Sequence, residues 1–221
     1  MLLNKTFEIM KRIIFAVLLL SSCLGLGAQQ LQSVPARQQA QMFQTINAAA
    51  SKITSITSSF TQVKTISFLN DKVRSTGNLY FTNQQQLRWE YISPYQYTFI
   101  INGEKVYIKN GKRSQTIDVK SSQMFKSIAR MMMNSITGRN LMDNRDFTSR
   151  LYLRGREWVA IMTPRRSQIK KMFKSVTLYF NEQHSMVSRV VMTEPSGDTT
   201  VITLSNVKIN ATIPEQIFVG R

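Results

Sequence analysis

The feature that most constrains the fold is the segment of residues 77–108, where apolar and polar side chains alternate along several short runs. Leu87, Trp89 and Tyr91 alternate with charged residues, which is the pattern of a β-strand with one face on a core and the other in water. Asn102-Gly103 is a strong hairpin signal, because both central residues of that turn need a positive φ, and the same dipeptide recurs eight residues later. The segment therefore predicts a meander of antiparallel strands with a large aromatic face.

Strand-like runs continue on both sides of this meander, and two helical segments interrupt them. Helical spacing of apolar residues predicts one helix over residues 36–54 and a second, methionine-rich helix over residues 118–136. From residue 147 the chain returns to strands separated by short polar turns. Roughly ten strands in sequence order predict an up-and-down antiparallel sheet that curls toward a barrel, with helices over one mouth.

The N-terminal segment has the pattern of a secretory signal peptide. Lys11 and Arg12 precede a short apolar run, residues 13–20, and small residues follow. The run is too short to span a bilayer, which takes about 20 residues. We expect a signal peptide over residues 1–28, with cleavage after Ala28 and a single domain over residues 29–221. Translation could begin at Met1 or at Met10, and Met10 gives the cleaner basic region.

Cys23 offers an alternative for the same segment. The run Leu-Ser-Ser-Cys that ends at Cys23 resembles a bacterial lipobox, and cleavage there would leave a lipid-modified cysteine at the new N-terminus. Cys23 is also the only cysteine. If Ala28 ends the signal peptide, the mature chain has no disulfide, no thiolate catalysis and no cysteine metal site, and its stability depends on its hydrophobic core.

The chain is strongly basic, with 29 Lys and Arg against 12 Asp and Glu and a formal charge of +17. Removal of the signal peptide takes away three basic residues and one acidic residue, which leaves +15. Such a charge favours anionic partners, among them a membrane surface, although ordinary solvated side chains explain it equally well. A basic cluster follows Pro164 and could meet lipid headgroups or form a solvated turn; it consists of Arg165, Arg166, Lys170, Lys171 and Lys174. No nucleic-acid-binding motif occurs, and we expect no nucleic-acid partner.

Few residues could support catalysis. His184 is the only histidine and falls in a predicted turn, where a solvated side chain is the simpler interpretation. The sequence has no Gly-x-Ser-x-Gly, no nucleotide-binding glycine motif and no cluster with metal-ligand spacing. Asp143 and Asp146 come closest to a carboxylate pair, so a hydrolase that uses them stays a minor alternative. We expect no enzyme, no cofactor and no metal.

Several motifs together resemble a known family. They are Ser59-Phe60-Thr61-Gln62, Gly77-x-Leu79-Tyr80-Phe81, Leu87-Arg88-Trp89-Glu90-Tyr91-x-x-Pro94, Asn102-Gly103 before Val106-Tyr107, Thr163-Pro164, and Pro214-x-x-x-Phe218. In this order, with a helix before them and a methionine-rich helix among them, they resemble the LolA family of periplasmic outer-membrane lipoprotein carriers. The resemblance covers nearly the whole mature chain, and the Leu-Arg-Trp-Glu-Tyr-x-x-Pro run is its most specific part.

The resemblance implies a mainly β chain of the α+β class: an unclosed antiparallel β-barrel of about ten to eleven strands with an α-helical lid. It further implies a monomer that takes acylated lipoproteins from an inner-membrane transporter and passes them to an outer-membrane acceptor. A methionine-rich helix suits an adaptable apolar cavity, although plain core packing is the alternative. The expected acyl cavity and lid residues are Leu79, Phe81, Trp89, Tyr91 and Phe99, by alternation in the strands, and Met124, Ile128, Met131 and Met132 in the methionine-rich helix.

The sequence departs from the family at one point. Many members have Arg-Pro where the second strand turns into the third, and that arginine helps to latch the lid, whereas Asn83-Gln84 stands here. Arg88 is close in sequence, but alternation places it on the face opposite to Trp89. A lipidated Cys23 would favour an outer-membrane acceptor of the same fold, as in LolB. A basic envelope interaction module that carries no lipid is the other alternative.

Overall fold

The structure is a computed structural model that describes residues 30–69, 71–111, 113–118, 131–139, 141, 146–183 and 185–220. Residues 131–137 are helical. The other elements are β1 (Gln32–Ser33), α2 (Ala36–Ser51), β2 (Ser55–Ile66), β3 (Asp71–Thr82), β4 (Gln86–Ser93), β5 (Tyr97–Asn102), β6 (Lys105–Asn110), β7 (Arg113–Asp118), β8 (Phe147–Arg154), β9 (Glu157–Pro164), α4 (Ser167–Lys170), β10 (Ser175–Phe180), β11 (Val187–Thr193), β12 (Thr199–Ile209) and the 3₁₀ helix η2 (Glu215–Phe218).

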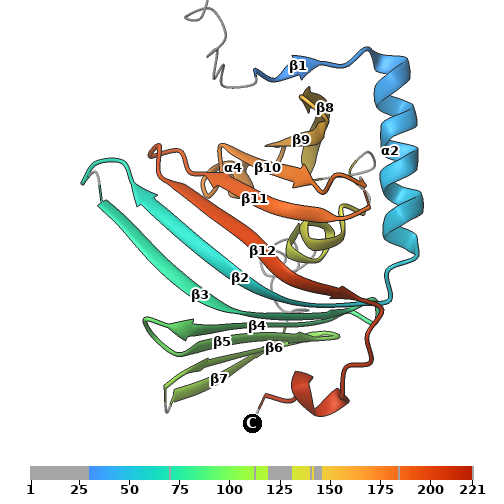
Figure 1. Cartoon of the computed structure of the whole chain (residues 1–221). Coiled ribbons are helices and arrows are strands. Elements are labelled where there is room, and N and C mark those ends of the chain that lie inside the picture. Colours follow the sequence, from blue (N-terminus) through green and yellow to red (C-terminus); the bar gives the residue numbers. More distant parts are fainter. Residues whose placement is uncertain are drawn as a thin grey trace, which may run out of the picture. The chain divides into compact units, whose positions relative to one another are not determined.

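The described strands form one antiparallel sheet of twelve, in the order β1-β8-β9-β10-β11-β12-β2-β3-β4-β5-β6-β7. The sheet curves strongly, and its edge strands β1 and β7 are not paired with each other in the described part of the chain, so the barrel is unclosed (Figure 1). This confirms the mainly β fold class. The strand count exceeds the expected ten to eleven because β1 pairs only two residues with β8, and so short a strand leaves no periodic signal.

The alternation in the meander predicts the buried face correctly. In β3, Leu79 and Phe81 are buried and their neighbours are partly exposed, and Leu87 and Trp89 repeat the pattern in β4. Leu79 lies directly opposite Trp89 across the β3–β4 pair. Gly77 stands at a register shift between β3 and β4, and a glycine inside a strand often marks such a bulge or a close backbone approach.

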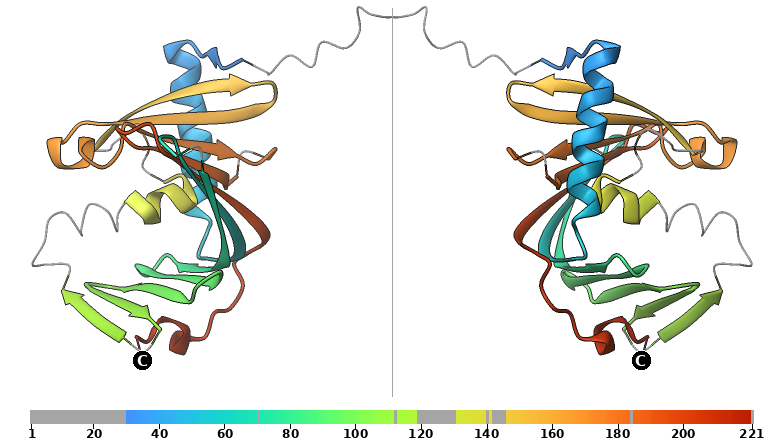
Figure 2. Two further views of the ribbon diagram at one scale, coloured as in Figure 1. Left: turned by 90° about the vertical axis from the view of Figure 1, so that its left-hand side faces the viewer. Right: turned by 90° about the vertical axis from the view of Figure 1, so that its right-hand side faces the viewer.

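The hydrophobic core has two parts. In the first, Met42, Phe43 and Ile46 on the apolar face of α2 pack with buried residues of β8–β10. The second is built mainly by β2–β6, with Phe60 and Trp89 among its members. Figures 1 and 2 show α2 along the end of the sheet opposite the β2–β3 turn. The sequence-predicted helix over residues 36–54 is therefore present but ends at Ser51.

The helical residues 131–137 lie inside the curve of the sheet and touch both parts of the core (Figure 1). Met131 belongs to the first part and Ile136 to the second. Gly138 follows with a φ of +74°, which is the left-handed conformation that ends many helices. Most of the predicted helix over residues 118–136, including Met124 and Ile128, lies outside the described residues.

In the part of the chain that the structure describes, no helix combines the length and the apolar character needed to cross a membrane.

Candidate functional site

An apolar cavity of about 300 Å³ lies on the concave face of the sheet, against the helical residues 131–137. This volume is at the lower end of the range of small-molecule sites. Its described lining is Gln62, Trp89, Tyr91, Tyr97, Phe99, Met131, Met132, Ser135, Ile136, Phe173, Val176, Val190, Met192 and Ile202. None of these lining residues is charged. The described lining can therefore receive an apolar group, and it contains no charged side chain to anchor an ion.

Five of the nine sequence-predicted site residues line this cavity, namely Trp89, Tyr91, Phe99, Met131 and Met132. Leu79 and Phe81 lie on the same face of the sheet, yet they are not part of the described lining. Their side chains are 0% and 5% exposed and belong to the packed core. Met124 and Ile128 lie outside the described residues.

Aromatic rings build one wall of the cavity. The ring of Phe60 lies behind this wall, with its centroid 4.3 Å from that of Trp89 and 5.3 Å from that of Tyr91 in an edge-on arrangement. Such pairs add stability beyond the area they bury and fix the orientation of the rings. The Tyr91 hydroxyl donates a hydrogen bond to Oε1 of Gln62 at 2.8 Å. Burial raises the pKa of Tyr91, so this polar group is uncharged at neutral pH.

The cavity is open to solvent and continues into a group of tyrosines. Tyr95 and Tyr97 both place their rings about 6 Å from that of Tyr91, at 5.9 and 6.0 Å between centroids. Tyr95 lies in the β4–β5 turn and is 51% exposed. Amphipathic rings of this kind suit the border between water and an apolar space.

The opposite wall comes from β10–β12, which sequence reasoning missed. Val190 pairs with Ile202 across β11–β12, and Met192 pairs with Val176 across β10–β11. The signal in the sequence is ambiguous, because residues 190–192 are all apolar and alternation cannot tell which of them point inward. Only the strand pairing assigns Val190 and Met192 to the concave face.

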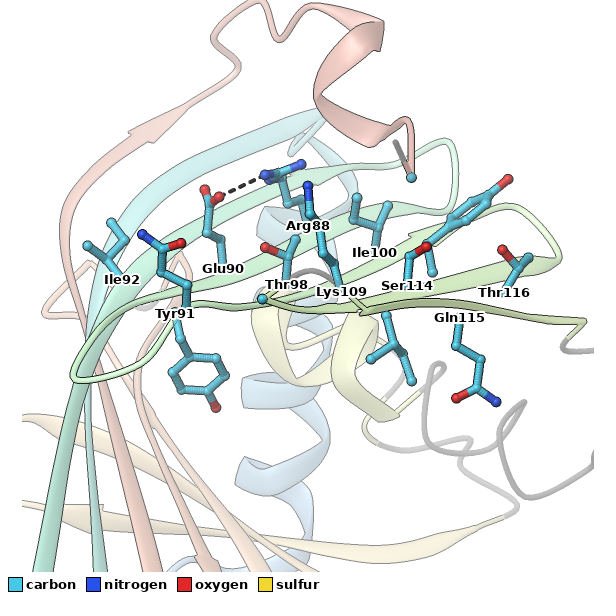
Figure 3. Close-up of a pocket in the computed structure, with 15 residues that line it drawn as sticks. Arg88, Glu90, Tyr91, Ile92, Thr98, Ile100, Lys109, Ser114, Gln115 and Thr116 are labelled. Carbon is cyan, nitrogen blue, oxygen red and sulfur yellow. Dashed lines mark hydrogen bonds and ion pairs between the residues drawn. The ribbon is translucent and has the colours of Figure 1, made fainter.

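A second cavity, of about 250 Å³, lies on the outer face of β4–β7 and is mostly polar (Figure 3). In Figure 3, Arg88 and Glu90 point away from the side of the strands that carries the Tyr91 ring, as alternation predicts. Nη2 of Arg88 lies 2.7 Å from Oε1 of Glu90, and Nη1 donates to the carbonyl oxygen of Ile217 at 3.2 Å. Arg88 thus holds the C-terminal segment, whose Phe218 is fully buried.

The turn at Asn83 and the chain that follows the helical residues 131–137 are each held by a hydrogen bond of their own. The backbone N–H of Asn83 donates to the carbonyl oxygen of Thr54 at 2.9 Å. Two residues after the helical segment, Nη2 of Arg139 donates to the carbonyl oxygen of Ala50 at 3.0 Å. Ala50 lies in the last turn of α2, where carbonyl groups lack partners within the helix and a cation is favourable.

Of the residues considered for catalysis, the structure describes only Asp146. Asp146 is buried immediately before β8, and Nε of Arg166 lies 3.0 Å from its Oδ1. Its sequence-predicted companion Asp143 lies outside the described residues, as does His184. Among the described residues no group of three or more His, Cys, Asp or Glu side chains could hold a metal ion.

Similarity to known proteins agrees with this fold. An uncharacterized conserved protein from Thermus thermophilus is similar with a TM-score of 0.51 and 11% identity, and the match covers 80% of this chain and 91% of that one. The MucA/MucB complex of Pseudomonas aeruginosa follows with a TM-score of 0.50 and 14% identity, and the match covers 82% of this chain and 61% of that one. A LolA superfamily protein from Nitrosomonas europaea has a TM-score of 0.44 and 14% identity, and the match covers 80% of this chain and 96% of that one. At these identities the first two indicate a shared fold alone. No curated protein sequence matches the chain. The family described as outer membrane lipoprotein carrier protein LolA matches residues 51–220. The chain therefore belongs to the LolA family.

Proposed function

We propose that this chain is a periplasmic carrier that holds the acyl chains of lipoproteins in the concave cavity and shuttles them from the inner to the outer membrane. The observation that carries the proposal is the open cavity of about 300 Å³ whose described lining has no charged side chain. Each CH₂ group removed from water contributes about 0.8 kcal/mol, so an acyl chain needs such shelter in order to cross an aqueous compartment.

A carrier must also release its cargo, and the composition of the lining suits release. Met131 and Met132 come from the helical segment, and Met192 comes from the facing strand β11. Methionine is unbranched and polarizable, so these side chains can repack around acyl chains of different shape without one rigid fit. Membership of the LolA family supports a lipoprotein-binding role.

In this proposal residues 1–28 are the signal peptide and residues 29–221 the carrier domain. An inner-membrane transporter hands over the lipoprotein, and an outer-membrane acceptor receives it. Native mass spectrometry of the protein, purified from periplasm without detergent, tests the cargo directly. We expect a bound mass that matches an acylated peptide or a lipid. The protein mass also tests cleavage after Ala28, whereas a chain with a lipid-modified Cys23 would be found in the membrane fraction.

A matched pair of variants tests the cavity itself. Val190 lines the cavity, and its neighbour Val191 points to the opposite face of β11. We expect Val190→Glu to weaken binding of a fluorescent fatty acid about tenfold or more, because a carboxylate in an apolar space is poorly solvated. Val191→Glu carries the same charge and should bind within about twofold of the parent.

Circular dichroism checks that both variants are folded, and the uncharged Val190→Gln replaces Val190→Glu if the latter unfolds. Equal binding by folded Val190 and Val191 variants would overturn the cavity assignment. An apo mass in the periplasmic preparation, together with no uptake of an added lipoprotein, would overturn the carrier function.

A further inference from the structure

Two large apolar side chains stand in water at the tip of the β2–β3 hairpin. Phe68 is 93% exposed and Leu69 is 63% exposed. A single exposed apolar residue is ordinary, but two adjacent ones at a narrow tip form a small apolar surface with no contribution to the core. We call these two residues the apolar tip.

The apolar tip is held out from the sheet by its pairing. β3 pairs with β2 from Asp71 onward, but β4 joins β3 only at Thr76. Residues 71–75 therefore extend beyond β4 by roughly 15 Å at the usual rise of a strand. Both the backbone N–H and the hydroxyl of Ser67 donate to Oδ1 of Asp198 at 2.9 Å. The base of the tip is thus fixed to the neighbouring β11–β12 turn.

A basic surface lies at the same end of the sheet. It is the connection between β9 and β10, and we call it the basic connection; its exposed cations are Arg165, Arg166, Lys170, Lys171 and Lys174. No acidic residue occurs between Pro164 and Ser175. Ile169 is buried and anchors this connection in the core, and the backbone N–H of Lys174 donates to the carbonyl oxygen of Thr193 at 2.7 Å.

Strand direction explains why the two features meet at one end. β2, β9 and β11 run the same way in the antiparallel sheet, so the connections that follow them lie at the same end. Figure 1 shows the β2–β3 turn, the β11–β12 turn and α4 on the side away from α2, and the left view of Figure 2 looks onto that end.

We propose that the apolar tip and the basic connection together bind the surface of an anionic lipid bilayer. Apolar side chains at a projecting tip can enter the interfacial layer of a bilayer, and cations beside them gain from anionic headgroups. A fluid interface receives such a tip without a complementary pocket, which a protein partner would have to supply. The positive charge of the basic connection agrees with this occupant, although one of its cations, Arg166, also pairs with the buried Asp146.

The position of the cavity links membrane docking to the carrier role, and this link rests on the proposed function. Tyr97 is the first residue of β5, Phe173 lies just before β10, and Met192 lies near the end of β11. All three line the cavity and lie toward the end that bears the apolar tip. A docked carrier would therefore present this part of its cavity to the membrane.

Flotation of the periplasmic protein with vesicles tests the proposal. One set of vesicles contains phosphatidylglycerol and phosphatidylethanolamine, and the other contains phosphatidylcholine alone. We expect binding to the anionic vesicles that falls as salt rises. The double variant Phe68→Ser/Leu69→Ser should bind about tenfold more weakly, and Lys170→Gln/Lys171→Gln should show both weaker binding and a smaller salt effect.

Matched controls lie at the opposite end of the sheet. Ile209 is 41% exposed at the end of β12, and Lys105 and Lys208 are exposed cations there. Ile209→Ser and Lys105→Gln/Lys208→Gln should bind vesicles like the parent.

No binding of the parent to anionic vesicles, or equal losses in the tip and control variants, would overturn the proposal. Uptake of the fluorescent fatty acid without vesicles is measured for every variant. Docking variants that lose vesicle binding and keep this uptake support the docking surface. If the parent takes up no fatty acid, the carrier function is overturned, and the vesicle-binding result remains valid.

Discussion

Replacement of Gly77 by alanine tests whether the packing of the aromatic wall requires a residue without a side chain at position 77. A Cβ at position 77 would lie 1.9 Å from the backbone oxygen of Glu90 and 2.6 Å from Cζ of Phe60. Real contacts of a Cβ stay above about 3.0 Å. Phe60 cannot retreat easily, since it is 2% exposed and stacks on Trp89. To reach 3.0 Å, the β4 backbone at Glu90 must move by about 1.1 Å and the Phe60 ring by about 0.4 Å.

The cost of this change follows from two opposing effects. Overpacking a well-packed site typically lowers the free energy of unfolding by about 1–3 kcal/mol. The added Cβ meets backbone on one side and a buried ring on the other, so we expect a cost at the upper end, about 3 kcal/mol. Alanine also restricts the unfolded chain, which returns about 0.4–1 kcal/mol. We expect Gly77→Ala to lower the free energy of unfolding by about 2 kcal/mol, which corresponds to a fall in Tm of about 4–8 °C for a domain of this size.

Urea unfolding and thermal melting measure this change, and Gly103→Ala is the control. Gly103 has a φ of +58° in the β5–β6 turn, but an added Cβ there meets no atom of the described residues within 4 Å. Its cost is backbone strain of roughly 1 kcal/mol, partly offset by the same effect on the unfolded chain. A Gly77→Ala protein within about 0.5 kcal/mol of the parent, or no less stable than Gly103→Ala, would refute the steric argument.

Two further predictions concern polar contacts. Arg139→Ala should lower the free energy of unfolding by about 1–2 kcal/mol, because it removes the charged donor to the carbonyl oxygen of Ala50; a urea midpoint equal to that of the parent would contradict this. The hydrogen bonds from Ser67 lower the pKa of Asp198, so its ionised form stabilises the fold above its unfolded pKa near 4 and this stabilisation is lost as the pH falls through the lower folded pKa. Between pH 6 and about pH 2, the Tm of Asp198→Asn should therefore fall less than the Tm of the parent. Equal falls in Tm would contradict a stabilising role of the ionised Asp198.

Most of the sheet could be predicted from the sequence because its strands have one face in the core and one in water. Leu79, Phe81, Leu87 and Trp89 show this alternation clearly, and all four are buried. Gly77 is informative for a different reason, since a glycine inside a strand usually marks a bulge or a close approach. The two-residue β1 was missed because nothing periodic fits in two residues.

The site could be predicted only in part, because alternation identifies a face of a strand but not how deep along that face the cavity lies. Leu79 and Trp89 face each other across β3 and β4, yet only Trp89 reaches the cavity. The difference depends on which side chains from distant strands cover each position. The wall from β10–β12 was missed altogether, since the run Val190-Val191-Met192 gives no period from which to choose a face.

The division of the core into two parts explains how the sheet can bury most of its apolar side chains and still leave a cavity on its concave face. α2 packs against β8–β10, and β2–β6 pack around Phe60 and Trp89, so each half of the curved sheet has a core of its own. Val190 and Met192 pack against both halves, and Met131 and Ile136 of the helical segment belong to one half each. Because this short segment contacts both cores beside the cavity, moving it would uncover the cavity and would also remove one buried side chain from each core. For the proposed carrier, we therefore expect binding and release of an acyl chain to depend on the position of residues 131–137.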